Sequence, residues 1–250
     1  MREFIDAAVF KDIILCANAA LEQNRQLINE LNVFPVPDGD TGTNMGMTIG
    51  AARTELLNLP DDCTVEKAAQ VTASAMLRGA RGNSGVILSQ LFRGICAECK
   101  KHEDVNIKAF ARAMENGTRV AYSAVSKPKE GTMLTVARMM SEFAVSSAAK
   151  FRDFTVFLEE VIKKGEEALA KTPEQLPVLK KAGVVDAGGM GFLCIYRGFL
   201  GALNGEEYEE LAAPDAQKAD EDVFGDNSDI INLDLGEIVF AYCTEFFIIN

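Results

Sequence analysis

Apolar residues recur at intervals of three and four along the first 205 residues of the chain. A typical run is Phe10, Ile13, Ile14, Ala17 and Leu21, and this spacing places apolar side chains on one face of a helix. The pattern predicts eight helices, each with ends accurate to a few residues, over 6–31, 43–58, 64–79, 84–102, 106–125, 132–149, 153–171 and 187–203. We find no convincing strand pattern before residue 230, so this region is predicted to be all-α.

The pattern changes from residue 230 onward. Ile230–Leu233 and Ile238–Ile249 are rich in β-branched and aromatic residues, a composition typical of strands. The sequence stops at Asn250 directly after this run, and we therefore expect it to be part of a longer protein.

Charge divides the chain near residue 205. Residues 1–205 contain 24 basic and 24 acidic residues, whereas residues 206–250 contain one lysine and 13 acidic residues. We predict a helical domain at 1–205, an acidic linker at 206–229 and the start of another domain at 230–250. An acidic tail repels phosphate and no basic stripe compensates for it, which argues against a nucleic-acid partner.

Membrane and secreted classes are also disfavoured. The most apolar stretch, Val184–Leu203, carries Asp186 and Arg197, so no transmembrane segment is predicted. Glu3 and Asp6 stand where a signal peptide would need a basic and then an apolar segment, so we expect a cytoplasmic protein. The six cysteines lie in apolar surroundings and are expected to be reduced and mostly buried.

The connections between the predicted helices alternate in composition. Short connections favour an up-and-down arrangement, in which alternate connections share one end. Three connections contain no glycine, at 58–62, 100–106 and 148–153. The four connections that alternate with them all contain glycine, at 35–44, 79–85, 127–133 and 182–191. Four helix N-termini thus open toward one end, where free amides predict a site for an anion such as phosphate. The alternative is that each glycine serves only a turn or a cap.

Two carboxylates stand in the first of these connections. Only Gly39 separates Asp38 from Asp40, and carboxylates so spaced in a turn converge on one hard cation such as Mg²⁺. Magnesium held by a few carboxylates is the usual partner of nucleotide phosphates. The alternative assigns Asp38 to a helix cap and Asp40 to a solvated turn. The sequence contains no P-loop, dinucleotide-binding or protein-kinase motif.

Four ordered motifs carry a family resemblance. Asn32–Met45, Gly79–Gly85, Gly131–Met133 and Gly183–Gly191 resemble the nucleotide-binding domain of the dihydroxyacetone kinase family. With Ala241–Phe246 after the acidic segment, the chain is most similar to the ATP-binding subunits of the fatty acid kinase branch. The resemblance implies an eight-helix antiparallel up-and-down barrel, followed by the first strands of a truncated α/β middle domain.

The resemblance also implies a site. Asp38 and Asp40 would be catalytic residues and metal ligands, with two magnesium ions expected. The family's third aspartate, upstream of this pair, is missing here, and Asn32 is the nearest candidate to replace it. ATP or ADP would contact Thr41, Gly42, Thr43, Asn44, Asn83, Ser84, Gly85, Thr132, Met133, Asp186 and Gly188.

The implied reaction transfers the γ-phosphoryl group of ATP to a fatty acid carboxylate, giving an acyl phosphate. The resemblance implies that a separate fatty-acid-binding protein presents this substrate, and that a homodimer could form through the missing C-terminal part. An ionised carboxylate needs no general base, which suits a chain whose one histidine, His102, lies in the fourth connection, away from the glycines. An alternative role for His102 is a metal site with Cys96 and Cys99.

Other functions within the same fold stay open. One is a dihydroxyacetone-type kinase acting on a small hydroxyketone, or a phosphotransferase-relay subunit with a fixed nucleotide. Relay relatives resemble Asp-Ala-Asp-His-Gly at the metal loop, whereas Asp38–Gly42 reads Asp-Gly-Asp-Thr-Gly, which favours exchangeable ATP. A further alternative is a non-catalytic scaffold that senses nucleotide.

Overall fold

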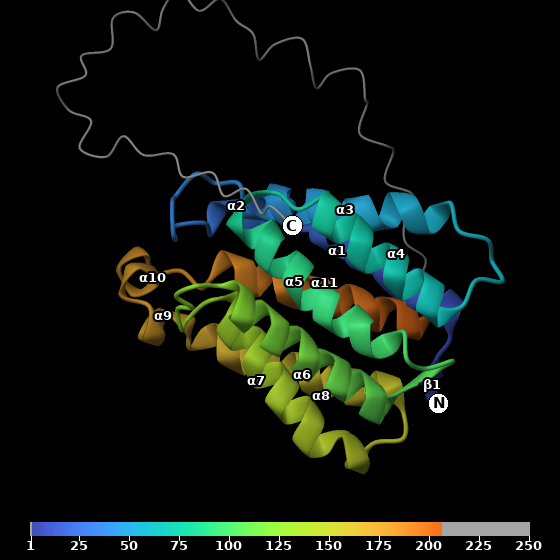
Figure 1. The fold of residues 1–250 in the computed structure, drawn as a ribbon. Coiled ribbons are helices and arrows are strands. Elements are labelled where there is room, and N and C mark those ends of the chain that lie inside the picture. Colours follow the sequence, from blue (N-terminus) through green and yellow to red (C-terminus); the bar gives the residue numbers. More distant parts are fainter. Residues whose placement is uncertain (1, 207–250) are drawn as a thin grey trace, which may run out of the picture. The chain divides into compact units, whose positions relative to one another are not determined.

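The computed structural model describes residues 2–206, which belong to the first of two compact units of the chain, Met1–Glu209. Eight long helices make up most of it (Figure 1), and they are α1 (Ala7–Gln23), α3 (Thr41–Leu57), α4 (Val65–Arg78), α5 (Gly82–Cys99), α6 (Ile107–Ala124), α7 (Met133–Ser147), α8 (Phe154–Ala170) and α11 (Ala187–Asn204). Short elements are α2 (Arg25–Glu30), η1 (Ala148–Lys150), α9 (Thr172–Gln175), α10 (Pro177–Ala182), β1 (Phe4–Ile5) and β2 (Val105–Asn106). The expected all-α fold is confirmed.

The long helices form a closed cycle of neighbours. Each packs against the next long helix along the chain, and α11 packs against both α8 and α1. Glycine allows the closest approaches: a Cβ on Gly94 of α5 would lie 2.5 Å from the Cα atom of Gly117 in α6. The buried side chains of all eight helices join in one hydrophobic core, which holds the two ends of the bundle in fixed positions.

Helices begin differently at the two ends of this bundle. At the end where Figure 1 shows β1, the starts of four helices are capped by their own N-cap side chains, and these residues are Asp6, Thr64, Asn106 and Asp153. At the opposite end, α3 and α5 begin without a hydrogen bond from their own N-cap side chains. The first amides of these two helices are therefore open to partners from elsewhere.

The structure corrects two expectations about local structure. A strand pair does occur before residue 230, because β1 pairs antiparallel with β2, Phe4 opposite Asn106 and Ile5 opposite Val105. Two-residue strands are too short to leave an alternating pattern in the sequence. The helix predicted over 6–31 is interrupted at Asn24, whose side-chain amide donates to the carbonyl of Ala20 at 2.8 Å before α2 begins.

Two short helices, α9 and α10, were not predicted. Each has a proline in its first turn, Pro173 in α9 and Pro177 in α10. The N–H groups of a first helical turn make no hydrogen bond within the helix, so proline, which has no N–H, is tolerated there. They are too short to show a helical apolar period.

Other sequence-based expectations concern the membrane, the cysteines and the C-terminal part. None of the helices in residues 2–206 is long and apolar enough to span a bilayer. No disulfide joins any of the five described cysteines, and burial raises the pKa of the Cys99 thiol to about 12. The predicted linker after Glu206 and the predicted domain at 230–250 lie outside the described residues.

Candidate functional site

The glycine-containing connections meet at the end of the bundle where Figure 1 shows α2, α9 and α10. Here Gly82 at the start of α5 lies against Asn44 of α3, and Gly188 at the start of α11 lies against Met133 of α7. A third contact, between Gly191 of α11 and Met45 of α3, joins the two pairs. The fold therefore brings the four predicted motifs together.

Asn29 of α2 holds the start of α3. Its Oδ1 accepts hydrogen bonds from the N–H groups of Gly42 at 2.7 Å and Thr43 at 3.1 Å, and its Nδ2 donates to Thr43 Oγ1 at 3.1 Å. The carbonyl oxygen of Arg25 occupies the space beside Gly42 that a Cβ would need. Asn29 thus acts as a helix cap supplied by another helix, and these two amides are not open to a ligand.

Sequence reasoning missed Asn29. A cap is sought in the residue directly before a helix, whereas this asparagine precedes α3 by a whole loop. The sequence gives no signal for it, because Asp40, a residue type that often caps helices, stands directly before α3.

Asp38 and Asp40 face each other in the loop before α3. Their carboxyl groups lie within hydrogen-bonding reach. Partial burial raises the pKa of Asp40, and the neighbouring Asp38 raises it further, although a hydrogen bond from the Asn44 side chain opposes both effects. The alternative in which Asp38 caps the helix is wrong, because the N-cap residue is Asp40 and its side chain makes no capping bond.

Asn32 is hydrogen-bonded to this pair of carboxylates. Its Nδ2 donates to Asp38 Oδ1 at 2.6 Å, while its own Oδ1 is buried without a hydrogen-bond partner in the described structure. A buried, unpartnered carbonyl oxygen is costly, and two facing carboxylates repel each other. A hard cation would relieve both costs, because Mg²⁺ takes oxygen ligands. The donor set of Asp38, Asp40 and Asn32 therefore fits magnesium.

The start of α5 lies next to this cluster with its first amides open. Gly82 has φ = +57°, and a Cβ there would collide with the side-chain amide of Asn44, so glycine is needed for both reasons. Thr48 of α3 fixes the approach by accepting a hydrogen bond from the Arg81 N–H at 3.3 Å. Within residues 2–206 no acceptor is found for the N–H groups of Gly82, Asn83 and Ser84. These three donors suit an anion.

Asp186 ties α11 to α7 on the other side of this end. The residue is buried, and its Oδ2 accepts a hydrogen bond from the Gly189 N–H at 2.7 Å. The N–H of Met133 donates to the same carboxylate, and the N–H of Asp186 donates to Thr172 Oγ1 at 3.1 Å. The carboxylate is occupied by backbone donors, and its predicted contact with a nucleotide stays a prediction.

Burial of Asp186 predicts that stability depends on pH. Burial raises the pKa of Asp186 from an ordinary 3.8 to about 6, against the lowering effect of the amide hydrogen bonds. The folded state therefore binds this proton more tightly than the unfolded state, and the resulting stabilisation is fully present below pH 3.8 and is lost as the pH rises through 6. Between pH 7 and pH 5 we expect the free energy of unfolding to increase by about 1 kcal/mol more than in Asp186→Asn.

Urea unfolding of the parent and Asp186→Asn proteins at pH 5, 6 and 7 measures this difference. The variant corrects for other groups whose pKa values are raised, Asp40 among them. Parallel pH dependences in the two proteins would show that Asp186 does not titrate in this range.

The predicted nucleotide contacts differ in how accessible they are. Thr41, Gly42, Gly85, Met133, Asp186 and Gly188 are buried. A ligand could reach the side chains that are exposed or half-buried, and these are Thr43, Asn44, Asn83, Ser84 and Thr132.

The alternative metal site at His102 does not form. Among residues 2–206 no group of three or more His, Cys, Asp or Glu side chains could hold a metal ion. Cys96 and Cys99 are buried in the core, and burial raises the pKa values of both thiols. His102 follows the C-terminal end of α5, away from the glycine connections, with its Nε2 3.7 Å from a carboxylate oxygen of Glu98.

These features define an all-helical domain with an oxygen-rich loop and an open helix start gathered at one end. The sequence matches the family model of the DAK2 domain over residues 35–201. The chain therefore belongs to the DAK2 domain family.

Similar proteins support this assignment. The chain is 43% identical over 245 residues to uncharacterized proteins from Staphylococcus aureus strains RF122 and USA300, in alignments that cover 96% of this chain and 43% of each relative. It thus spans less than half the length of these relatives. Among solved structures, dihydroxyacetone kinase from C. freundii in complex with AMP-PNP and Mg²⁺ has a TM-score of 0.58 at 16% identity, over 80% of this chain and 34% of that one. The native form of that kinase has a TM-score of 0.55 at 18% identity, over 80% of this chain and 36% of that one.

Proposed function

We propose that this domain is the ATP- and magnesium-dependent part of a kinase that phosphorylates the carboxylate of a fatty acid presented by a separate fatty-acid-binding protein. The observation that carries the proposal is the hydrogen-bonded cluster of Asp38, Asp40 and Asn32 beside the open amides of α5, with Asn44 in contact with both. Membership of the DAK2 domain family supports it, and so does a fold shared with a kinase solved with AMP-PNP and Mg²⁺.

In this proposal the residues at the glycine end have separate roles. Asp38, Asp40 and Asn32 would hold magnesium, with two ions expected, and bound magnesium would neutralise charge on the phosphates. The N–H groups at the start of α5 would bind phosphate oxygens. Thr132, which is half-buried, would border the nucleoside, and the buried Gly188 would support that side of the site.

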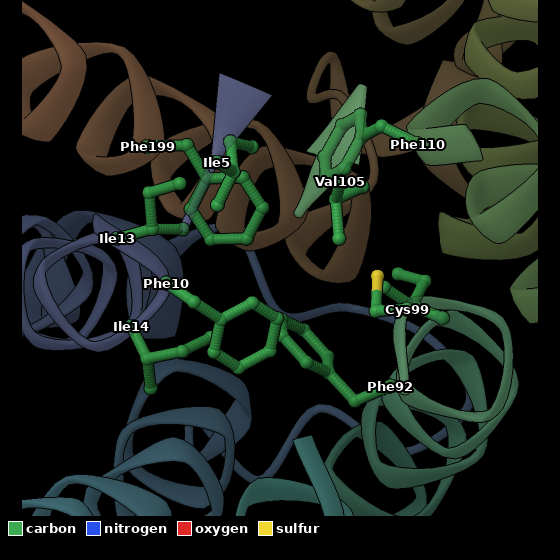
Figure 2. Close-up of a pocket in the computed structure, with 10 residues that line it drawn as sticks. Ile5, Phe10, Ile13, Ile14, Phe92, Cys99, Val105, Phe110 and Phe199 are labelled. Atoms are coloured by element: carbon green, nitrogen blue, oxygen red, sulfur yellow. The ribbon is translucent and has the colours of Figure 1, made fainter. Parts of the chain in front are cut away.

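The acceptor is proposed to arrive on another protein. Figure 2 shows a cavity in the core, and among the side chains that line it are Phe92, Phe110 and Phe199. Its volume is only about 10 Å³, which is close to the space of a single water molecule. An acyl chain does not fit there, and the cavity also contacts Ile5 and Val105 of β1 and β2, far from the candidate phosphate site. This core cavity is therefore not the place where the acceptor would be held.

The proposed reaction needs no general base. One carboxylate oxygen of the fatty acid forms a bond to the γ-phosphorus while the bond from that phosphorus to the bridging oxygen of ADP breaks. The carboxylate is already ionised at neutral pH, so no proton is removed. Catalysis then depends on positioning and on neutralisation of charge, which agrees with the position of His102 at the opposite end.

We expect ATP consumption by the full-length protein only when a fatty-acid-loaded binding protein and magnesium are both present. The measurement follows ADP release and traps the acyl phosphate with hydroxylamine, using oleate on its binding protein, free oleate and dihydroxyacetone as separate acceptors. Turnover with dihydroxyacetone would instead establish the hydroxyketone kinase. Tight Mg-ATP binding without turnover on any acceptor would favour the nucleotide-sensing scaffold.

A further inference from the structure

Four exposed lysines gather at the end of the molecule that holds the candidate site. Lys127 and Lys129 lie in the connection before α7, and Lys180 and Lys181 lie in the last turn of α10. None of the four takes part in an ion pair with any residue of the described range 2–206. We call these four residues the lysine rim.

The connection that carries Lys127 and Lys129 contacts α9 and the residue directly before α10. A Cβ on Gly131, just after Lys129, would lie 2.9 Å from the carbonyl oxygen of Thr172 and 3.0 Å from the Leu176 side chain. The chain then turns from α10 toward α11, and the Val184 N–H donates a hydrogen bond of 3.2 Å to the Leu179 carbonyl in this turn. Figure 1 shows α9 and α10 at this same end. The four lysines therefore lie at the same end of the bundle, in the segments that lead into α7 and α11.

Acidic residues nearby do not neutralise this surface. Glu130 is held by Arg138, with 2.9 Å between Oε2 and Nη2, and Asp186 is buried. Glu174, in the neighbouring α9, is exposed and takes part in no ion pair with a described residue. Lys180 and Lys181 also interact favourably with the C-terminal dipole of α10, but that does not account for Lys127 or Lys129. The local excess of positive charge contrasts with the balanced charge of residues 1–205.

The nucleotide in the proposed site would not use this charge. The phosphates are proposed to lie on the side of Asp40 and α5, whereas the lysines of the rim precede Thr132 and Gly188 in the sequence, on the side proposed for the uncharged nucleoside. A bilayer is also a poor partner, because surfaces that bind lipid combine lysines with large apolar or aromatic side chains. Within the two rim segments, Val178 is the one large apolar residue that is exposed.

We propose that the lysine rim docks an acidic face of the protein that presents the acceptor. This inference rests on the proposed function, since that function requires a protein-bound acceptor to reach this end of the domain. Lysines without ion-pair partners attract an acidic protein surface toward the site, and they fix the orientation in which that protein binds.

The test measures binding of an oleate-loaded fatty-acid-binding protein from the same organism to the full-length protein, by calorimetry at low and high salt. The variants are Lys127→Glu/Lys129→Glu and Lys180→Glu/Lys181→Glu. The matched control is Lys108→Glu/Lys150→Glu, which reverses two exposed lysines, likewise outside any described ion pair, on α6 and η1 near the β1 end. Mg-ATP affinity and ATP turnover are measured on the same preparations.

We expect each rim variant to weaken partner binding by about tenfold at low salt, and the difference to shrink at high salt because salt screens exposed charges. Mg-ATP affinity and the control variant should stay close to the parent. Unchanged partner binding, or an equal loss in the control, would overturn the proposal. An equal loss of Mg-ATP affinity would assign the lysines to the nucleotide, and tighter partner binding would indicate that the chain's own acidic segment occupies the rim. If the parent binds the partner without turning over ATP, the proposed kinase activity is refuted. The binding data still decide whether the lysine rim docks the partner.

Discussion

Replacing Asp38 by asparagine is expected to abolish tight, magnesium-dependent binding of ATP. The substitution keeps the size of the side chain but removes one negative charge from the cluster formed with Asp40 and Asn32. A site that selects a hard cation depends on charged oxygen ligands, so we expect the dissociation constant of Mg-ATP to rise by about 100-fold or more. Calorimetric titration with ATP, with and without magnesium, measures this change.

Two variants complete the design. Asp40→Asn should show a similar loss, because Asp40 faces the same cluster. His102→Ala should bind Mg-ATP like the parent, since His102 lies beyond the C-terminal end of α5 and contacts Glu98 rather than the site.

Folding should survive all three substitutions. Asp38 is exposed, and substitutions in exposed loops usually cost little stability. In the metal-free protein, loss of one of two facing carboxylates also relieves repulsion. Thermal melts without magnesium check this point. If Asp38→Asn binds Mg-ATP as tightly as the parent while folding normally, the proposed metal site and the reaction built on it must both be abandoned.

The fold could be predicted from the sequence because its long helices are amphipathic and its connections are short. The apolar period located all eight long helices, but it extended the first one across Asn24, where a side-chain bond to Ala20 ends α1. Periodicity records which residues face a core, and a local break that leaves the apolar positions in place is invisible to it.

The candidate site was only partly predictable. Only Gly39 separates Asp38 from Asp40 in the sequence, so their meeting in the folded loop follows from local geometry. Asn29 reaches the start of α3 only because α2 packs on it. The burial of Asp186 likewise depends on the packing of α7 and α11. Contacts made by tertiary packing leave no mark at a fixed spacing along the chain.

The closed cycle of helices depends on a backbone approach between α1 and α11 that can be tested directly. A Cβ on Gly198 would lie 2.6 Å from both the Cα atom of Ala17 and the carbonyl oxygen of Cys16. Backbone atoms cannot move aside as a flexible side chain can, so Gly198→Ala must push α11 away from α1. We expect this variant to lose about 3 kcal/mol of unfolding free energy, at the upper end of the cost of overpacking a core.

Gly50→Ala is the matched control, because Gly50 also lies inside a long helix, α3, but has room for a methyl group. The nearest atom to a Cβ there is Asn18 Nδ2 at 3.6 Å. Since alanine favours a helix over glycine by about 1 kcal/mol, Gly50→Ala should be neutral or stabilising. Helix propensity alone predicts that both substitutions increase the free energy of unfolding. A decrease for Gly198→Ala together with no decrease for Gly50→Ala, measured by urea unfolding, therefore isolates the contact between α1 and α11. Equal stabilisation of both variants would show that α11 closes the cycle without a tight backbone contact to α1.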